Sequence, residues 1–199
     1  LGCGIQTGAG AVLNFLKPEP ASSIMVTGCG PVGVAAIMAA KIAGCTTIIA
    51  CDIVESRLEL CKKYGATHTV NSKEIKDVVA YVNEITGGGC DYTVDCTAFG
   101  PCIHQSLSCC KSLGTCAVIG GAPKLELNVE VDLVSRGRKL CGITEGLSNP
   151  KVFIPQLLEY YRQGKFPFDE LITYYPFEKL NEALADTKSG VTMKAVVKM

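Results

Sequence analysis

The sequence predicts a doubly wound α/β domain, in which helices cover both faces of a parallel sheet. Two observations predict it. Short runs rich in β-branched residues alternate with helical stretches over roughly residues 5–146, and these runs are apolar throughout rather than at every second position. Strands of that composition are buried on both faces, as in a parallel sheet between two layers of helices.

The first elements follow this alternation closely. SSIMVTG (22–28) is a β-branched run, and PVGVAAIMAAKIAG (31–44) is a helix that is apolar on nearly every side. TTIIACD (46–52) is the second expected strand, and the amphipathic ESRLELCKKYGA (55–66) is a helix that a glycine ends. THTVN (67–71) is a short third strand.

The same order continues in the next stretch. KEIKDVVAYVNEIT (73–86) is expected to be a helix, because apolar residues recur at helical spacing and three glycines follow it. YTVDCT (92–97) and GTCAVIGG (114–121) are apolar strands on either side of the expected helix PCIHQSLSCCK (101–111). KLCGITEG (139–146) is the last strand of the domain.

The pattern changes after Pro150. KVFIPQLLEYYRQGK (151–165) and FEKLNEALADTKSG (177–190) are expected helices, each ended by a glycine. ELITYYPF (170–177) and TMKAVVKM (192–199) are expected strands with no sheet of their own, so this segment is expected to pack on the α/β domain or to belong to another domain. The expected division is therefore 1–149 and 150–199.

Composition excludes several classes of protein. Nineteen Lys and Arg balance nineteen Asp and Glu, whereas a nucleic-acid binder has a basic excess. With 48% hydrophobic residues the chain is not disordered, and no apolar run reaches the roughly 18 residues that a membrane span needs. We expect a soluble protein without nucleic-acid or membrane partners. Because the chain of 199 residues starts at Leu1 in a glycine-rich segment, we also expect it to be a piece of a longer protein.

Twelve cysteines raise the question of disulfides or metal. No pair has C-x-x-C spacing and the chain has only two histidines, so a zinc site complete within the chain is not expected. Most of these cysteines lie in apolar runs, where a thiol behaves as a small buried hydrophobe. We therefore expect the protein to be located in the cytoplasm, which is a reducing compartment.

A glycine-rich loop carries the main functional signal. Gly28-Cys29-Gly30-Pro31-Val32-Gly33 has the form G-x-G-x-x-G between a strand and a helix, as in the Rossmann dinucleotide-binding fold. Gly28 permits the tight turn, Gly30 allows a pyrophosphate to approach the backbone, and Gly33 allows the helix to pack on the strand. The helix N-terminus then favours the anion.

Asp52 strengthens this interpretation. It lies 19 residues past Gly33 at the end of the second strand, where its carboxylate can accept hydrogen bonds from a ribose and repel a 2′-phosphate, so NAD is expected rather than NADP. Arg57 either contacts the same ribose or is a surface residue of its helix. S-adenosylmethionine enzymes have a similar loop and acid, but their sheets usually end in a reversed hairpin that this sequence lacks.

Ser148, Tyr161 and Lys165 suggest a different dehydrogenase. Their spacing is that of the Ser and Tyr-x-x-x-Lys residues of short-chain dehydrogenases, in which the lysine lowers the pKa of the tyrosine. However, Gly164 and Pro167 end the helix around Lys165, and the glycine loop departs from the short-chain pattern at Val32. We therefore expect no such active site.

The chain resembles the zinc-containing medium-chain alcohol dehydrogenases over its whole length. The segments that carry the resemblance are GCGIQTGAGAVLN, DIVESRLEL and EGLSNPKVFIPQLLEYYRQGKFPFDELI, which look most like the aryl-alcohol (benzyl alcohol) branch. The resemblance implies that the chain is roughly the C-terminal half of a family member, with the NAD-binding domain first and the returning part of the catalytic domain after it.

The resemblance also implies roles for single residues. Cys3 matches the third ligand of the catalytic zinc, although taken by itself it would read as a buried thiol. Other matches lie along the coenzyme, from the adenosine half through the pyrophosphate turn to the nicotinamide: Asp52, Thr97, Gly30, Pro31, Val32, Thr7, Ile119, Gly121, Ile143 and Glu145. Lys194 matches a basic residue that reaches the pyrophosphate, where many members carry Arg.

The expected activity is hydride transfer from a primary, aromatic alcohol to NAD, with zinc holding the alcohol oxygen. This chain supplies one of three zinc ligands, so it is expected to be inactive alone. The alternatives are a non-catalytic NAD(H)-binding or redox-sensing module and a zinc-free medium-chain reductase. We also expect a homo-oligomer, a dimer or tetramer, because the last strand leaves an apolar sheet edge.

Overall fold

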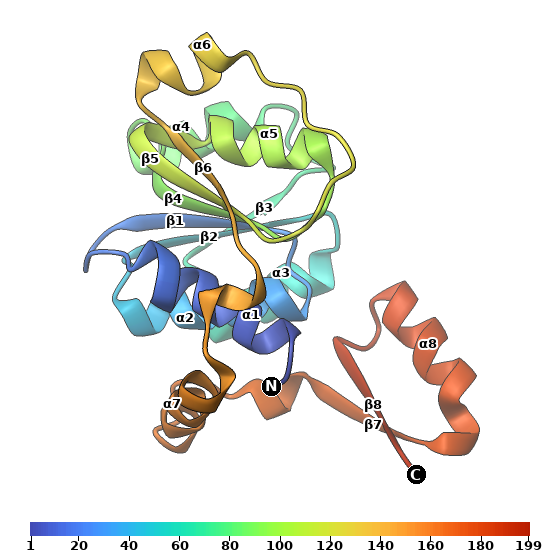
Figure 1. Ribbon diagram of the computed structural model, residues 1–199. Helices are drawn as coiled ribbons and strands as arrows, with labels where there is room; N and C mark the ends of the chain where they lie inside the picture. Colours follow the sequence, from blue (N-terminus) through green and yellow to red (C-terminus); the bar gives the residue numbers. More distant parts are fainter.

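Six parallel strands form the central sheet of the computed structural model, which describes all of residues 1–199 (Figure 1). The strand order is β3-β2-β1-β4-β5-β6, so the order reverses between β1 and β4. Their bounds are β1 Ser23–Thr27, β2 Thr47–Asp52, β3 His68–Asn71, β4 Cys90–Asp95, β5 Cys110–Val118 and β6 Lys139–Gly142. This is the doubly wound Rossmann order, which confirms the expected fold class.

Helices cover both faces of the sheet (Figure 1). One layer holds α1 (Gly4–Gly10), α2 (Pro31–Ala43) and α3 (Glu55–Tyr64), and α7 (Pro150–Arg162) packs on α1. The other layer holds α4 (Val78–Thr86) and α5 (Gly100–Ser108), and the short α6 (Val129–Asp132) precedes β6. Each crossover from one parallel strand to the next therefore runs over one face or the other, as a doubly wound sheet requires.

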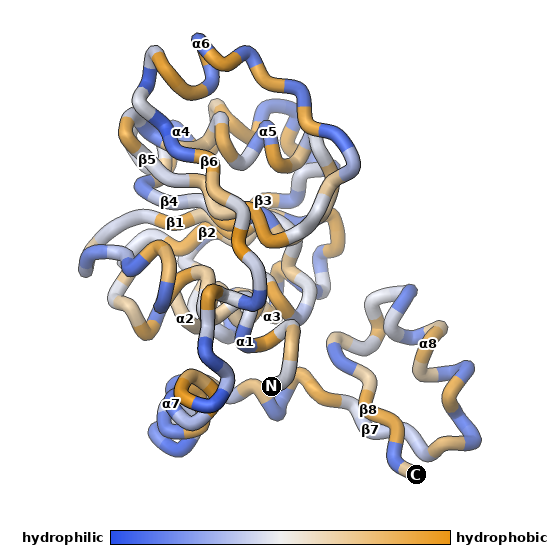
Figure 2. Tube along the Cα trace, viewed as in Figure 1, coloured by the Kyte–Doolittle hydropathy of each residue, from blue (hydrophilic) through white to orange (hydrophobic).

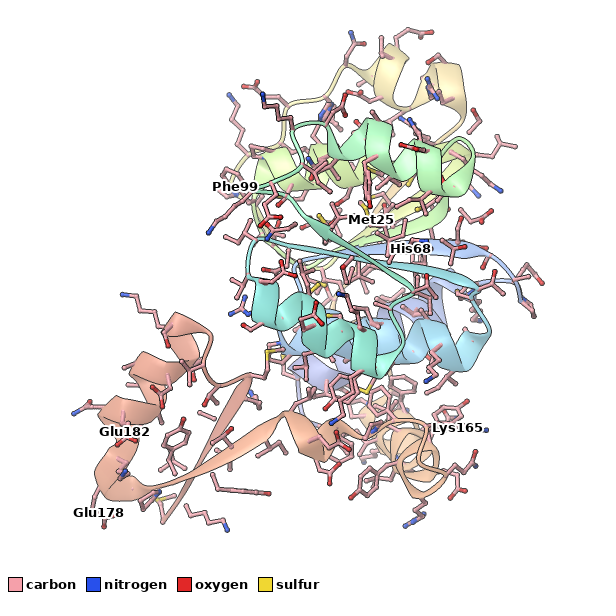
Figure 3. All side chains as sticks on the ribbon, turned by 180° about the vertical axis from the view of Figure 1, so that it is seen from behind. Met25, His68, Phe99, Lys165, Glu178 and Glu182 are labelled. Carbon is pink, nitrogen blue, oxygen red and sulfur yellow. The ribbon has the colours of Figure 1, made fainter.

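Apolar clusters on both faces bury the sheet. Ile24 and Val26 of β1 pack into the larger cluster with α2, whereas Met25 between them packs with α4. Met25 lies between the helical layers in the view from behind (Figure 3), and the tube is mostly apolar along the inner strands (Figure 2). Because successive residues of a strand point to opposite faces, a strand between two helical layers must be apolar at every position.

Three predicted boundaries are wrong. Helix α4 begins at Val78 rather than at residue 73, because the carboxylate of Asp77 caps it by accepting from the Ala80 N–H at 2.9 Å. Helix α5 ends at Ser108 and β5 already begins at Cys110, where Arg138 donates to the carbonyl oxygens of Ser108 and Cys110. Strand β6 ends at Gly142, because residues 145–147 form a tight 3₁₀ turn, η3.

The first residues form a helical segment that the sequence did not predict. Helix α1 continues directly into η1 (Ala11–Leu16), a single turn or so of π-helix. The glycines of α1 let it cross α2 closely: a Cβ on Gly8 would lie 2.0 Å from the carbonyl oxygen of Val32. Only glycine fits at such a contact. This crossing places Cys3 and Thr7 near the start of α2.

The end of the chain forms a small βαβ unit beside the main sheet. Strands β7 (Ile172–Pro176) and β8 (Lys194–Lys198) pair in parallel, and α8 (Leu180–Ser189) connects them. The expectation that these strands have no sheet of their own is therefore wrong, since they pair with each other. The unit projects from the α/β domain in Figure 1, and Figure 3 shows Glu178 and Glu182 on it.

No helix of the chain is both long and apolar enough to cross a membrane. All twelve thiols are free, and most are buried, as the sequence predicted. Burial raises the pKa of Cys51 to about 12 and that of Cys110 to about 11. Such thiols are almost entirely protonated at neutral pH and are poor nucleophiles.

Candidate functional site: a dinucleotide cleft

The glycine-rich loop adopts the geometry that its sequence predicted. Gly28 has a positive φ of 87°, and a Cβ on Gly33 would lie 2.0 Å from the carbonyl oxygen of Gly28, so both positions require glycine. Gly30 has open space where a Cβ would be, and no side chain caps α2, whose first helical residue is Pro31. The free N–H groups of this helix end therefore face an accessible surface, which suits a pyrophosphate.

Asp52 lies beside this loop with its carboxylate held from three sides. Its Oδ2 accepts from the Cys29 N–H at 2.6 Å, and its Oδ1 accepts from the N–H groups of Ile53 and Val54 at 2.7 and 2.9 Å. Arg57 is the nearest cation, with Nη1 3.9 Å from Oδ2. Each carboxylate oxygen has two acceptor sites, so Oδ2 keeps one for an incoming hydroxyl.

A cleft of about 560 Å³ opens above these residues, at the point where the strand order reverses. In open α/β sheets, ligands bind in this crevice at the carboxyl ends of the strands. The structure brings eight of the predicted residues together here: Gly28, Gly30, Pro31, Val32, Gly33, Asp52, Arg57 and Thr97.

Other lining residues of the cleft were not predicted. They are Thr27, Cys51, Ile53, Ser72, Cys96, Phe99 and Cys102. Most of them end or directly follow a strand, and that position is the signal from which they were predictable. Ile53 and Phe99 are each more than half exposed at the rim, which offers apolar contact to a flat ring. Figure 3 shows Phe99 just before α5.

Cys3, the candidate zinc ligand, lies in a second group of polar residues. Its thiol donates to Oε1 of Glu145 at 3.3 Å, and Gln6 donates to Oε2 of the same carboxylate at 3.3 Å. Ser148 in turn donates to the side-chain oxygen of Gln6. The hydrogen bond to Glu145 is the main cause that raises the pKa of the exposed Cys3 thiol. Gln6 and Ser148 were not predicted as members of this group.

The turn that carries Glu145 is tightly held. Glu145, Gly146 and Leu147 all have positive φ values, and a Cβ on Gly10 would lie 2.4 Å from the carbonyl oxygen of Gly146. Glu145 and Leu147 are not glycine, so a left-handed backbone is strained for them, and the close contact between η3 and α1 keeps them in that conformation. The contact fixes the position of Glu145 relative to Cys3.

The remaining predicted residues lie outside the cleft lining. Thr7 is buried in α1 and donates to the carbonyl oxygen of Cys3 at 2.8 Å. Ile119 and Ile143 extend the carboxyl ends of β5 and β6, donating to the carbonyl oxygens of Asp95 and Val118, and Gly121 follows at the surface. Lys194 begins β8, where its charge lowers the pKa of Cys3 slightly against the stronger effect of Glu145. The structure does not place Lys194 in the cleft.

Comparison with known proteins decides the family. The family model described as zinc-binding dehydrogenase matches residues 31–159, which is more than half of the chain. This chain belongs to the zinc-binding dehydrogenase family. Geraniol dehydrogenase from Castellaniella defragrans is 39% identical over 99% of the chain and 53% of its own length, and a probable S-(hydroxymethyl)glutathione dehydrogenase from Schizosaccharomyces pombe is also 39% identical. This dehydrogenase chain spans about half the length of the relatives it matches.

Solved structures agree with this assignment. Benzyl alcohol dehydrogenase from Acinetobacter calcoaceticus superposes with a TM-score of 0.96 at 46% identity, covering 100% of this chain and 55% of the other. An alcohol dehydrogenase zinc-binding domain protein from Burkholderia ambifaria gives 0.96 at 49% identity, covering 100% and 54%. Both confirm the fold and the expected relation to one half of a zinc-type alcohol dehydrogenase.

Cys3 is the one zinc ligand that the family resemblance implied within this chain. Cys3 is exposed and precedes α1, so its sulfur can approach a metal. No group of three or more His, Cys, Asp or Glu residues is close enough together to hold a metal within the chain. That Cys3 binds zinc stays a prediction at this point.

The short-chain constellation does not assemble in this dehydrogenase. Ser148 donates to Gln6 and to the Glu145 carbonyl, whereas the hydroxyl of Tyr161 donates to Asp169 at 3.0 Å. Helix α7 ends at Arg162, so Lys165 does not share a helix face with Tyr161. Hydrogen bonding to Asp169 raises the pKa of Tyr161, which is the opposite of what that chemistry needs.

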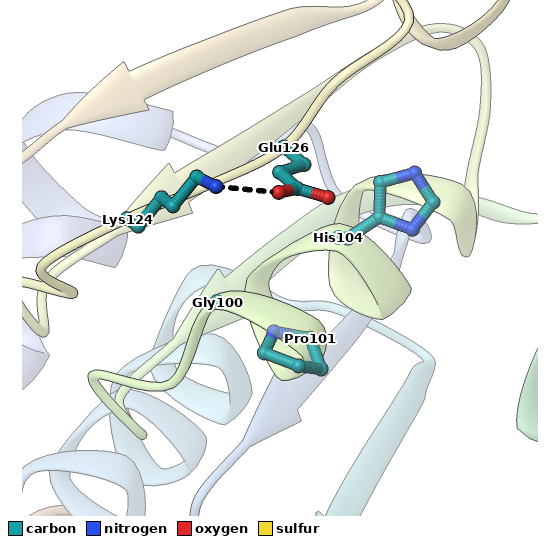
Figure 4. Close-up of a pocket in the computed structure, with 5 residues that line it drawn as sticks. All are labelled: Gly100, Pro101, His104, Lys124 and Glu126. Carbon is teal, nitrogen blue, oxygen red and sulfur yellow. Dashed lines mark hydrogen bonds and ion pairs between the residues drawn. The ribbon is translucent and has the colours of Figure 1, made fainter.

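A different pocket of about 400 Å³ lies at the start of α5 (Figure 4). It is lined by Gly100, Pro101, His104, Lys124 and Glu126. Lys124 and Glu126 pair with each other at 2.6 Å across it. Its two charges neutralise each other, and it lacks both the glycine loop and Asp52, so it does not match the predicted dinucleotide site.

Proposed function

We propose that the protein is an NAD-dependent alcohol dehydrogenase and that this chain is its coenzyme-binding part. The observation that carries the proposal is the cleft in which Asp52, with one acceptor site open, lies beside an uncapped helix end and the open backbone at Gly30. A diphosphate with a ribose hydroxyl pair fits this combination. The names of the relatives support an alcohol as the substrate.

We further propose a primary, aromatic alcohol as the substrate. The benzyl alcohol dehydrogenase that superposes at 46% identity supports this class, whereas geraniol dehydrogenase, at 39%, is named for an allylic alcohol that is not aromatic. Both compounds have a planar unsaturated group next to the hydroxyl carbon. The test must therefore compare the two.

Different residues of the chain are proposed to bind different parts of the coenzyme. Gly30, Pro31 and Val32 present the helix end to the pyrophosphate, and Asp52 accepts from the adenosine ribose. A 2′-phosphate would place a second negative charge against Asp52, so NAD is preferred to NADP. Arg57 lies beside the same ribose position with its buried Nε unpaired.

We place the reacting end of the coenzyme at the group of polar residues around Cys3 and Glu145. Thr7, Ile119, Gly121, Ile143 and Glu145 surround the proposed nicotinamide end, and Lys194 is proposed to reach the pyrophosphate when the protein is complete. Cys3 is proposed as one zinc ligand, and the metal would supply a Lewis acid for the alcohol oxygen. The hydrogen bond from the Cys3 thiol to Glu145 orients the Cys3 sulfur.

The remaining assignments are proposals of the same kind. We place the NAD-binding domain at residues 1–149 and a returning part of the catalytic domain at 150–199, where the βαβ unit projects beside the sheet. A cytoplasmic location is proposed because unpaired thiols persist in a reducing compartment.

Steady-state assays on the complete protein test the function. We expect oxidation of benzyl alcohol and of geraniol with NAD, with kcat/KM larger for benzyl alcohol and at least tenfold lower with NADP. Activity with NADP alone, or with a quinone substrate alone, would sink the proposal. A protein that binds NAD but oxidises no alcohol would instead be the non-catalytic module, and one that needs no zinc would be the zinc-free reductase.

A further inference from the structure

Asp95 is a buried charge that nothing in the proposed function uses. It ends the central strand β4, its residue is 0% exposed, and it does not line the cleft. None of the ion pairs of the chain involves it. Burial raises the pKa of Asp95, so its ionised form destabilises the fold at neutral pH unless hydrogen bonds offset the cost.

The hydrogen bonds of Asp95 lead to the cleft wall. Its Oδ1 accepts from the N–H and the hydroxyl of Thr97 at 3.0 and 2.9 Å. Its Oδ2 accepts from Ser106 at 3.4 Å, and the Ser106 hydroxyl lies 2.8 Å from that of Thr27. Thr27 and Thr97 both line the cleft. The carboxylate therefore supports that wall from behind.

The turn that Asp95 holds, residues 96–99, packs closely against the backbone at Gly28 and at Gly120. Ala98 in this turn has a positive φ of 57°, which is strained for a residue with a side chain. A Cβ on Gly28 would lie 3.0 Å from Cγ2 of Thr97, and a Cβ on Gly120 would lie 2.4 Å from the backbone nitrogen of Ala98. A shift of the turn would thus displace the loop that is proposed to bind the pyrophosphate.

We infer that Asp95 is a positioning residue for the coenzyme: its carboxylate holds residues 96–99 in the strained turn that shapes the adenosine end of the cleft before the ligand arrives. The inference rests on the proposed binding of NAD in this cleft. A turn that is already ordered costs no ordering entropy on binding, so affinity is gained without any contact between Asp95 and the ligand.

Calorimetric titration of the complete protein with NAD and with AMP tests this role. Asp95→Ala should weaken both ligands about tenfold and by the same factor, since the defect lies at the adenosine end. Asp95→Asn keeps an acceptor for Thr97 and can donate to Ser106, so its affinities should stay within threefold of the wild type.

Asp91→Ala is the matched control. Asp91 lies on the same strand at the opposite end, where it accepts from the N–H and the hydroxyl of Ser23 at 2.8 and 2.7 Å and pairs with Lys111. Its loss should lower the melting temperature but leave both affinities unchanged. Equal weakening by the two alanine variants, or an asparagine variant as weak as the alanine one, would overturn the inference.

Hydrogen exchange of the unliganded wild type gives an answer even if Asp95→Ala does not fold. The Thr97 amide should be protected before any ligand is added, because it is bonded to Asp95. Free exchange that slows only with NAD would show that the turn is ordered by the ligand and would overturn the inference. A wild type that binds neither NAD nor AMP would refute the proposed function itself.

Discussion

At the scale of single residues, Asp52 is the side chain with the clearest expected effect. Asp52→Ala removes the ribose acceptor and the charge that disfavours a 2′-phosphate, so NAD should bind at least tenfold more weakly and the preference over NADP should shrink. It also leaves the N–H of Cys29 without its acceptor, which should lower the free energy of unfolding by about 1–3 kcal/mol. Titrations with both dinucleotides measure the first effect and thermal unfolding the second.

A comparison with Asp77→Ala separates the two effects. Asp77 also accepts a backbone N–H, but it lies at the start of α4 and outside the cleft lining. If Asp52→Ala changes neither NAD affinity nor the ratio of NAD to NADP beyond what Asp77→Ala does, Asp52 is not the ribose ligand. Equal binding of both dinucleotides to the wild type would lead to the same conclusion.

The sequence was sufficient for those residues that local geometry dictates. The G-x-G-x-x-G turn and the acid that ends the second strand lie in one continuous stretch, so their roles can be predicted without the rest of the fold. Phe99 and Ser72 join the cleft only because β4 and β3 end at the same edge of the sheet. Cys3 and Glu145 are 142 residues apart, and their contact depends on how η3 packs against α1.

At the scale of elements, the start of α4 shows what decides a helix boundary. KEIKD has no strong helix breaker, yet the helix starts after Asp77 because its carboxylate satisfies the Ala80 N–H. Asp77→Ala should therefore lower the free energy of unfolding by about 1 kcal/mol. Chemical denaturation measures the change, and Lys73→Ala, at a position outside the helix, serves as the control. A loss no larger than that of the control would show that the cap does not hold this boundary.

The strands themselves were easier to predict than the pairing of β7 with β8. Strands β1 and β2 are buried at nearly every position and carry consecutive apolar residues in their middles, because both faces are covered, and this signal is local. Strands β7 and β8 carry exposed residues such as Tyr174 and Lys198, and nothing in their composition shows that they pair with each other. Their pairing follows from α8, which joins them in the manner of a βαβ crossover.

At the scale of the whole molecule, the sheet has an edge that no other part of the chain pairs with. Strand β6 pairs only with β5, and α7, which follows the break at Pro150, packs on α1 instead. We propose that two copies pair through β6, because an unpaired strand edge favours such contacts and a two-fold contact is the commonest oligomer geometry.

The hydrogen bonds of β6 decide which substitution tests this dimer. The Ile143 N–H donates to the Val118 carbonyl at 2.8 Å, inside the molecule, so the neighbouring Gly142 N–H points to the free edge. A Cβ at Gly142 would meet no atom within 4 Å, and because its N–H is not used inside the molecule, we expect a proline to be tolerated there. Gly142→Pro should convert the dimer to a monomer in light scattering at high micromolar concentration, with the melting temperature of the monomer little changed. Ile143→Pro breaks the internal bond instead and should mainly destabilise the fold. A wild type that is strictly monomeric, or a dimer that survives Gly142→Pro, would rule out pairing through β6.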